Sequence, residues 1–366
     1  FRQLAVKLGQ HQAPPLWRQV GWLTLALAGG LILHLALPDQ AVSKAERRKL
    51  AQFPENLTAD SLEEYLLDQF PGRDGLRTIK AVWTYDILLQ KDNNGVFVHD
   101  GSVSKLDGTL DEKQVGLFTE KFTKLHEKLF PDSAVWYAVV PDKNYTLTQE
   151  TDYPRMDYDA LLQSVQDGLS WAQYCDLTDA LDWHSYYTTD SHWRQELLQP
   201  VVSRLAAVMD VDLPDLDTYR QTVLPGFYGV YYGQAALPMA AEKLTYLENE
   251  VTDQAVVTGP ELDGEQHVYA PEKFQDMDGY DVFLHGAQAV LTVENPLAQT
   301  DRELIIFRDS FGSSLTPLLL AGYKTVTLVD IRYVRSDYLD QFVDFHGQDV
   351  LILYSTTLIN GASVLR

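Results

Sequence analysis

The stretch Glu303 to Asp330, ELIIFRDSFGSSLTPLLLAGYKTVTLVD, decides the fold class. The apolar residues Leu304 to Phe307 form the short run typical of a strand buried on both faces. The segment 313–321 is predicted to be helical, with Pro317 tolerated only near the first turn. Thr325 to Val329 is a second buried strand. This strand–turn–helix–strand order predicts an α/β protein with a mainly parallel sheet.

Ser310 follows the first of these strands directly and precedes the helix. Open α/β sheets bind ligands at the carboxyl ends of their strands, and a helix N-terminus favours a developing negative charge. Ser310 is therefore a candidate nucleophile. The alternative on this stretch alone is that Ser310 only caps the helix, as many serines do.

The composition excludes some classes of partner. The 366 residues carry a formal net charge of −23, which argues against nucleic acid as a partner and against a strongly anionic polymer as substrate. The apolar and charged fractions, 45% and 22%, are ordinary for a globular protein. Cys175 is the single cysteine, so neither an intrachain disulfide nor a cysteine metal cluster is expected. No residue pattern calls for a cofactor.

The N-terminal part contains an uncharged run from Val20 to Leu37, which is nearly long enough to cross a bilayer as a helix. We expect a transmembrane signal anchor at 20–38. Basic residues lie on both sides of the run, so their count does not decide its orientation. The resemblance described below implies a cytoplasmic tail at 1–19 and an extracytoplasmic domain at 39–366 at the cell surface. A buried soluble helix and a cleaved signal peptide are the alternatives for this run.

The remaining pattern adds helices and strands to both ends of the central unit. The segment 41–90 is mainly helical, and 213–281 is rich in proline and predicts an irregular, loop-rich insertion. The apolar spacing predicts helices at 111–129, 158–174 and 337–345, and strands at 95–98, 134–140 and 350–354.

A second group of polar residues lies in YYTTDSHWR, residues 186–194. Asp190 or Ser191 is expected to cap a long helix that Pro200 kinks. At such a helix start Asp190 and His192 can turn toward one site, where a carboxylate fixes the histidine tautomer and supports a general base. The alternative is that Asp190 only caps the helix and His192 packs. A metal site with His184 lacks a further ligand at a recognised spacing.

These segments together resemble the DHHW family and the related alginate-type polysaccharide O-acetyltransferases. TTDSHW, residues 188–193, is similar to the Asp-His-His-Trp motif, and FRDSFGSSLTPLL, residues 307–319, to the segment that holds the family's serine. Four weaker matches occur in the same order: ERRKLAQFPE (46–55), DQFPGRDGLR (68–77), VPDKNY (140–145) and YDVFLHGAQA (280–289). The matches extend from residue 46 to about residue 333.

The resemblance implies an SGNH-hydrolase-like, three-layer αβα domain in which the Asp and His precede the Ser. Ser310 would be the nucleophile, His192 the base and Asp190 its orienting partner. Members of these families O-acetylate exopolysaccharides at or outside the membrane, and they usually receive acetyl from a multi-span membrane-bound O-acyltransferase. The expected acceptor is therefore a polysaccharide.

The expected chemistry is a two-step acyl transfer through an acetyl-serine. Sugar stacking is expected from the tyrosines of GFYGVYYGQ, residues 226–234, although ordinary packing is the alternative. The candidate substrate-binding residues are Tyr228, Tyr231, Tyr232, Trp193, Gln288 and Arg308. An acetylesterase and a non-catalytic polysaccharide-binding protein of the same fold remain alternatives.

One departure from the family pattern concerns the oxyanion. His285-Gly286-Ala287 stands where the family has Gly-Gly-Asn. Ala287 has no side-chain donor, so the expected oxyanion donors are the backbone N–H of Ser310 and a group at Gly286 or Gln288.

Overall fold

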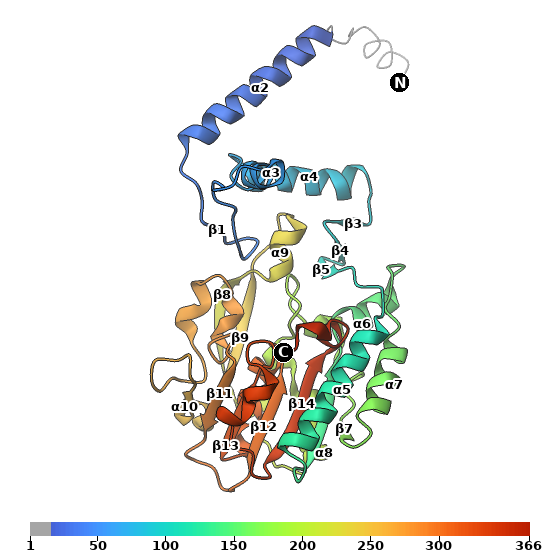
Figure 1. Ribbon diagram of the computed structural model, residues 1–366, viewed down its shortest axis with the longest axis vertical. Helices are drawn as coiled ribbons and strands as arrows, with labels where there is room; N and C mark the ends of the chain where they lie inside the picture. The colour runs from blue at the N-terminus through green and yellow to red at the C-terminus, as the bar shows by residue number, and fades with distance from the viewer. Residues whose placement is uncertain (1–15) are drawn as a thin grey trace.

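The computed structural model describes residues 16–366 and is built around one large sheet (Figure 1). Its spatial order is β10 (Val256–Thr258), β11 (Val290–Glu294), β13 (Thr325–Val329), β12 (Glu303–Arg308), β14 (Asp349–Ser355), β6 (Val135–Val140) and β7 (Gln173–Tyr174). The five strands from β13 to β7 are parallel, and β11 and β10 extend the sheet antiparallel. The predicted mainly parallel α/β sheet, including the two strands of the central stretch, is confirmed.

Helices cover both faces of this sheet and give the expected three layers. In β12, Leu304 and Ile306 pack into a core with α8 (Gln199–Met209) and α11 (Phe311–Leu319). Ile305 and Phe307 pack into the opposite core with α5 (Glu112–Leu129) and α7 (Tyr158–Gly168). Successive side chains of a strand point to opposite faces, so a strand that is apolar throughout requires this double cover.

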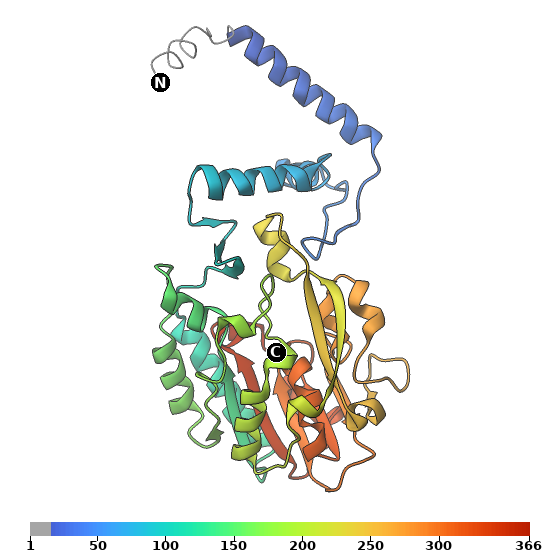
Figure 2. The ribbon, with the colours of Figure 1, turned by 180° about the vertical axis from the view of Figure 1, so that it is seen from behind.

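A smaller layer lies beyond the carboxyl ends of the parallel strands (Figures 1 and 2). It contains the helices α2 (Leu16–Ala36), α3 (Ala59–Asp68) and α4 (Arg73–Val82), and a π-helical turn (Trp83–Ile87) continues α4. It also contains two short antiparallel strands, β1 (Val42–Ser43) and β2 (Arg48–Lys49). Next to it lie the antiparallel strands β3 (Asp92–Asn93), β4 (Val96–His99) and β5 (Ser102–Lys105). The expected helical character of 41–90 is confirmed for 59–68 and 73–87, whereas 41–58 contains no helix.

The helix α2 covers most of the expected signal anchor. By length and hydropathy, no helix in the described part of the chain, residues 16–366, qualifies as a membrane span. The anchor at 20–38 therefore stays a prediction, and most of the expected cytoplasmic tail, residues 1–15, lies outside the described residues.

The supposed loop-rich insertion at 213–281 is more regular than expected. It contains β8 (Arg220–Phe227) paired antiparallel with β9 (Glu242–Glu248), and the helices α9 (Val230–Ala235) and α10 (Glu250–Gln254). Proline does not prevent the pairing, because the ladder shifts register between Pro225 and Phe227 and Gly226 takes a positive φ of 98° at that point.

Three helix boundaries also differ from the expectation. The helix α11 starts at Phe311, directly after Ser310, so Pro317 lies near its end rather than in its first turn. The helix α7 ends at Gly168, because the chain then joins the sheet as β7. Only a 3₁₀ segment, Ser336–Gln341, forms within the expected helix at 337–345. The other helices are α6 (Asn144–Leu147) and α12 (Thr356–Ile359).

Candidate active site

Ser310 lies at the sharp turn between β12 and α11, where the strand leaves the sheet. Its backbone is helical, with φ −62° and ψ −21°, and its side chain makes no capping hydrogen bond. Its Oγ instead lies 2.7 Å from Nε2 of His192. The interpretation of Ser310 as a plain helix cap is therefore wrong.

Asp190 and His192 meet in an irregular loop. Nδ1 of His192 lies 2.6 Å from Oδ1 of Asp190, and the His192 backbone N–H donates to the same oxygen at 3.0 Å. The other oxygen, Oδ2, accepts a hydrogen bond from the backbone N–H of Val230 at 2.8 Å. A carboxylate on Nδ1 keeps the proton there and leaves Nε2 free to accept one from Ser310.

The loop is not the helix start that the sequence predicted. An isolated bridge pairs Tyr186 with Trp193, and the helix α8 begins only at Gln199. Pro200 lies in the first turn of that helix and does not kink it. Proline has no backbone N–H, and the N–H groups of a first turn have no partner within the helix in any case. The expected cap by Asp190 or Ser191 is thus wrong, whereas the expected meeting of Asp190 and His192 is confirmed.

The buried Lys143 and the partly exposed Glu242 hold this loop through its backbone. Nζ of Lys143 donates to the backbone carbonyls of Tyr187 at 2.7 Å, Thr188 at 3.1 Å and Asp190 at 3.3 Å. The Glu242 carboxylate accepts from the backbone N–H groups of Thr188 at 2.6 Å and Thr189 at 2.8 Å. Lys143 therefore binds the carbonyls and Glu242 the N–H groups of one short segment.

Arg47, in the turn between β1 and β2, reaches the same loop from the N-terminal layer. Its Nη1 lies 3.5 Å from Oδ2 of Asp190 and 2.8 Å from Oδ1 of Asp278, and its Nη2 donates to the Tyr228 carbonyl. The Arg47 side chain is 9% exposed. The first segment after α2 thus contributes a buried cation beside Asp190.

Aromatic rings fix the plane of the histidine. Tyr280 stacks on the His192 ring at 3.9 Å between centroids and an interplanar angle of 11°. The Tyr280 hydroxyl donates to Oγ of Ser314 at 2.7 Å, and the Trp193 indole N–H donates to the same oxygen at 2.8 Å. Ser314 lies on α11, so this network ties the histidine loop to the helix that follows Ser310.

Burial and neighbouring charges shift the pKa values of His192, Asp190 and Lys143. Burial lowers the pKa of His192, but the Asp190 carboxylate more than offsets this effect, and the net pKa is raised above its usual value. Burial likewise opposes the ionisation of Asp190, yet His192 and Arg47 hold its pKa far below the usual range. Burial lowers the pKa of Lys143 to about 7, against the opposing effects of Glu242 and Asp190.

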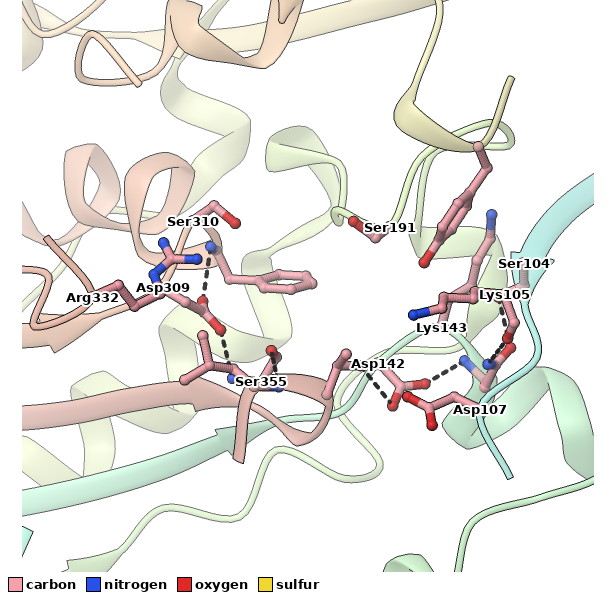
Figure 3. A pocket seen from close by; sticks show the side chains of 15 residues that line it. Ser104, Lys105, Asp107, Asp142, Lys143, Ser191, Asp309, Ser310, Arg332 and Ser355 are labelled. Atoms are coloured by element: carbon pink, nitrogen blue, oxygen red, sulfur yellow. Dashed lines mark hydrogen bonds between the residues drawn. The ribbon is translucent and has the colours of Figure 1, made fainter. Parts of the chain in front are cut away.

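A polar cavity of about 290 Å³ opens beside Ser310 (Figure 3). Asp309, Arg332 and Ser355 lie on the side of Ser310, whereas Lys105, Asp107 and Asp142 lie on the far side, with Ser191 between the two groups. Apart from Ser191, which lies in the His192 loop, these residues lie at or just after the carboxyl ends of β12, β13, β14 and β6 and the end of β5. A cavity with donors and acceptors on opposite walls can bind a hydroxyl-rich molecule next to the serine.

The structure brings only one of the predicted substrate-binding residues to this cavity, namely Tyr231. Tyr228 and Tyr232 contact each other with centroids 4.3 Å apart, and Tyr228 is 39% exposed outside the cavity wall. Trp193 is fully buried and serves the Ser314 network. Its expected role in substrate binding is wrong, because its ring has no access to a ligand.

Arg308 and Gln288 are also placed away from the cavity. Arg308 is 1% exposed and its Nη1 lies 3.8 Å from Oδ2 of Asp330. Gln288 donates to the His285 carbonyl at 3.3 Å. The arginine that does line the cavity is Arg332, which the sequence reasoning missed. It follows β13 at the same sheet edge and holds Asp330 with Nε at 2.9 Å and Nη2 at 2.6 Å.

The expected oxyanion donors differ in availability. The Gly286 N–H already donates to the Phe283 carbonyl at 3.1 Å. The Phe311 N–H donates to Oδ1 of Asp309 at 3.1 Å. Among the residues that the structure describes, the Ser310 N–H has no internal hydrogen-bond partner. It is the donor best placed to receive an oxyanion formed at Ser310.

Comparisons with known proteins identify the fold. A scan against protein-family models and a search of curated proteins both gave no match. Among solved structures, a DHHW family protein from Eubacterium siraeum is similar with a TM-score of 0.61 and 21% identity, over 75% of this chain and 94% of that chain. Bacillus cereus PatB1, solved with a sulfonyl adduct, is similar with a TM-score of 0.58 and 15% identity, over 72% of this chain and 95% of that chain. The fold expected from the resemblance to DHHW proteins is therefore confirmed.

Proposed function

We propose that this protein is an O-acetyltransferase that transfers acetyl groups to hydroxyls of a polysaccharide through an acetyl-Ser310 intermediate. The observation that carries the proposal is a pair of hydrogen-bond contacts on the two sides of the His192 ring. Nδ1 lies 2.6 Å from Oδ1 of Asp190, and Nε2 lies 2.7 Å from Oγ of Ser310. A serine hydroxyl is inert at neutral pH, and such a base is what activates it.

In the first half-reaction Ser310 Oγ attacks the carbonyl carbon of an acetyl donor while His192 Nε2 takes the hydroxyl proton. The Ser310 N–H stabilises the oxyanion of the tetrahedral intermediate. As the intermediate collapses, the bond from the acetyl carbon to the donor's leaving oxygen breaks, and His192 returns the proton to that oxygen. Asp190 stabilises the imidazolium in between without taking the proton.

The second half-reaction repeats these steps with a sugar hydroxyl. His192 removes the proton of the acceptor hydroxyl, the acceptor oxygen attacks the acetyl carbon, and Ser310 leaves with the proton from His192. Water that attacks in place of the sugar would give hydrolysis. Transfer therefore depends on an acceptor that fills the cavity and excludes water.

The cavity supports a hydroxyl-rich acceptor of low negative charge. Its walls carry hydroxyl, amide, carboxylate and cationic groups, and the net charge of −23 disfavours a strongly anionic polymer. The fold supports the acyl-enzyme step, because the similar PatB1 structure carries a sulfonyl adduct. Sulfonyl fluorides modify activated serines, so we expect the same reagent class to modify Ser310.

The test offers the protein p-nitrophenyl acetate together with a neutral oligosaccharide, and separates the products by mass spectrometry. We expect acetylated oligosaccharide in the wild type and none with Ser310→Ala. Ser313→Ala, in the first turn of α11, is the matched control and should keep the product. Release of acetate alone, at a rate the oligosaccharide does not change, would assign the site to an esterase instead.

A further inference from the structure

The helix α4 and the π-helical turn that continues it, Trp83–Ile87, have an outer face that is apolar although it faces solvent. Leu76, Ile79, Trp83 and Ile87 are 51%, 64%, 54% and 58% exposed. They are separated by three, four and four residues, and residues at such spacings share one face of a helix. These four side chains therefore form a single stripe, which we call the α4 stripe.

The opposite face of α4 is the one that contacts the rest of the protein. Arg77 donates to the Gly233 carbonyl at 2.8 Å and pairs with Glu46 at 2.9 Å. Ala81 is fully buried, and Thr84 is buried one turn later. A surface helix of a soluble protein normally buries its apolar stripe and exposes its polar face. In α4 this arrangement is inverted, and no residue of the described range 16–366 covers the stripe.

Neighbouring helices extend the exposed apolar surface. The side chains of Leu62, Leu66, Leu67 and Phe70 are exposed on and just after α3. The Phe70 ring lies against α2, since a Cβ added at Gly30 would come within 3.2 Å of it. Exposed apolar side chains continue along α2 at Leu25, Ile32 and Leu33. Contiguous apolar surface of this kind marks an interaction site.

We propose that the α4 stripe lies on a lipid bilayer, with its side chains at the boundary between headgroups and acyl chains. The stripe is a row of apolar side chains on the outside of one helical run, and a bilayer can receive such a row without a complementary groove. Trp83 has the amphipathic ring favoured at this depth. The formal net charge of −23 of the chain disfavours anionic headgroups. The lipid surface is therefore zwitterionic, and apolar burial drives binding.

This orientation places the candidate active site toward the bilayer. The carboxyl ends of the parallel strands point to the layer that holds α3 and α4 (Figure 1). The inference does not depend on the acyl-transfer chemistry, because it rests on surface residues far from Ser310 in the sequence.

The test measures the depth of single labelled positions in the full chain. Ile79→Cys is labelled with an environment-sensitive fluorophore and mixed with phosphatidylcholine vesicles that contain acyl-brominated lipid. Leu117→Cys, on α5 and 39% exposed, is the matched control. The native Cys175 is fully buried, and burial raises its thiol pKa to about 11, so the introduced thiol reacts first.

We expect a blue shift and quenching at position 79 and neither at position 117. Replacing Leu76 and Trp83 together by serine should remove most of the blue shift and the quenching at position 79, whether or not α2 also binds the vesicle. Replacing the exposed Tyr333 and Tyr338 by serine should change them little. An unquenched label at position 79 would overturn the proposal. Self-association of the chain that the α4 replacements abolish would assign the stripe to a second copy.

Discussion

Ser310 lies in a segment whose position is set by regular secondary structure, whereas Asp190 and His192 lie in a loop held by buried side chains. The strand before Ser310 is paired in parallel on both sides, with β13 and β14. The loop around Asp190 has one isolated bridge, and side chains from elsewhere in the chain, above all Lys143 and Glu242, bind its backbone. Because the two segments are supported in different ways, a substitution can displace His192 and leave Ser310 in place, or the reverse.

The largest effect should come from the carboxylate itself. Asp190→Asn keeps the size of the side chain but favours the wrong tautomer of His192, which costs roughly 10⁴-fold in serine triads. We expect a loss of that order in the rate at which Ser310 is acetylated, followed by peptide mass spectrometry. Thermal unfolding should show a folded protein, and full activity would show that the carboxylate has no part in the chemistry.

The next effect should come from the lysine that holds the loop. Lys143→Met leaves the carbonyls of Tyr187, Thr188 and Asp190 without their donor. A displacement of about 1 Å costs on the order of 10²-fold in rate, and a buried carbonyl left without its donor costs about 1–3 kcal/mol of unfolding free energy. Labelling of Ser310 by a sulfonyl fluoride and urea unfolding measure the two quantities.

Lys124→Met is the control for that substitution, because Lys124 forms a surface ion pair with Glu120 at 2.5 Å on α5. It should leave the labelling rate unchanged. If Ser310 of Lys143→Met is labelled as fast as that of the wild type, the loop around Asp190 does not depend on Lys143. The contrast between a strand-supported nucleophile and a side-chain-supported base would then be wrong.

Arg47 should have a smaller effect, visible mainly in the pH profile. His192 must be neutral to act as a base, and its pKa is raised, so activity should fall with acidification from a pH above about 6.5. Arg47→Ala removes a positive charge near the imidazolium, which raises the His192 pKa further and moves this acidic limb to higher pH. We also expect Ser310 to be acetylated at a roughly fivefold lower rate, because the lost ion pair is worth about 1 kcal/mol.

Arg48→Ala is the matched control, because Arg48 pairs with Glu46 and Asp68 and not with Asp190. Its pH profile should coincide with that of the wild type. An unmoved acidic limb in Arg47→Ala would show that the N-terminal layer does not act on the pair.

The smallest effect on chemistry should come from the core beneath the serine. Leu315, on α11, is fully buried, so Leu315→Ala should cost about 2–5 kcal/mol of unfolding free energy. The acidic limb should stay in place and the acetylation rate should change by less than about twofold, since the β12 pairings still fix the strand before Ser310. A shifted acidic limb would contradict the separate support of the two segments.

The sequence predicted the first segment well and the second only in part. The apolar run at 304–307 and the turn after it are local features, and they place Ser310 at the sheet edge without further information. The apolar spacing around Trp193 predicts a helix, but the segment is an irregular loop. Lys143 and Glu242 bind it, and they lie about 50 residues away in the sequence, one on either side. Contacts at that separation leave no mark in local periodicity.

The cavity wall shows the same limit. Tyr228, Tyr231 and Tyr232 are neighbours in the sequence, but only Tyr231 lines the cavity. Tyr228 lies before α9, and Tyr231 and Tyr232 are successive residues of this helix and so point in different directions. Arg332 was missed although it follows the predicted strand at 325–329, at the edge where ligand-binding residues gather. Arg308, the last residue of β12, is buried instead.

The most direct test of the proposed chemistry is the location of an acetyl group after reaction with p-nitrophenyl acetate. Trypsin cleaves after Arg308 and Lys324, so fragmentation of the peptide 309–324 distinguishes Ser310 from Ser313 and Ser314. We predict one acetyl group on Ser310, absent in Ser310→Ala and strongly reduced in His192→Ala. An acetyl group on another residue, or undiminished turnover in Ser310→Ala, would contradict the proposal.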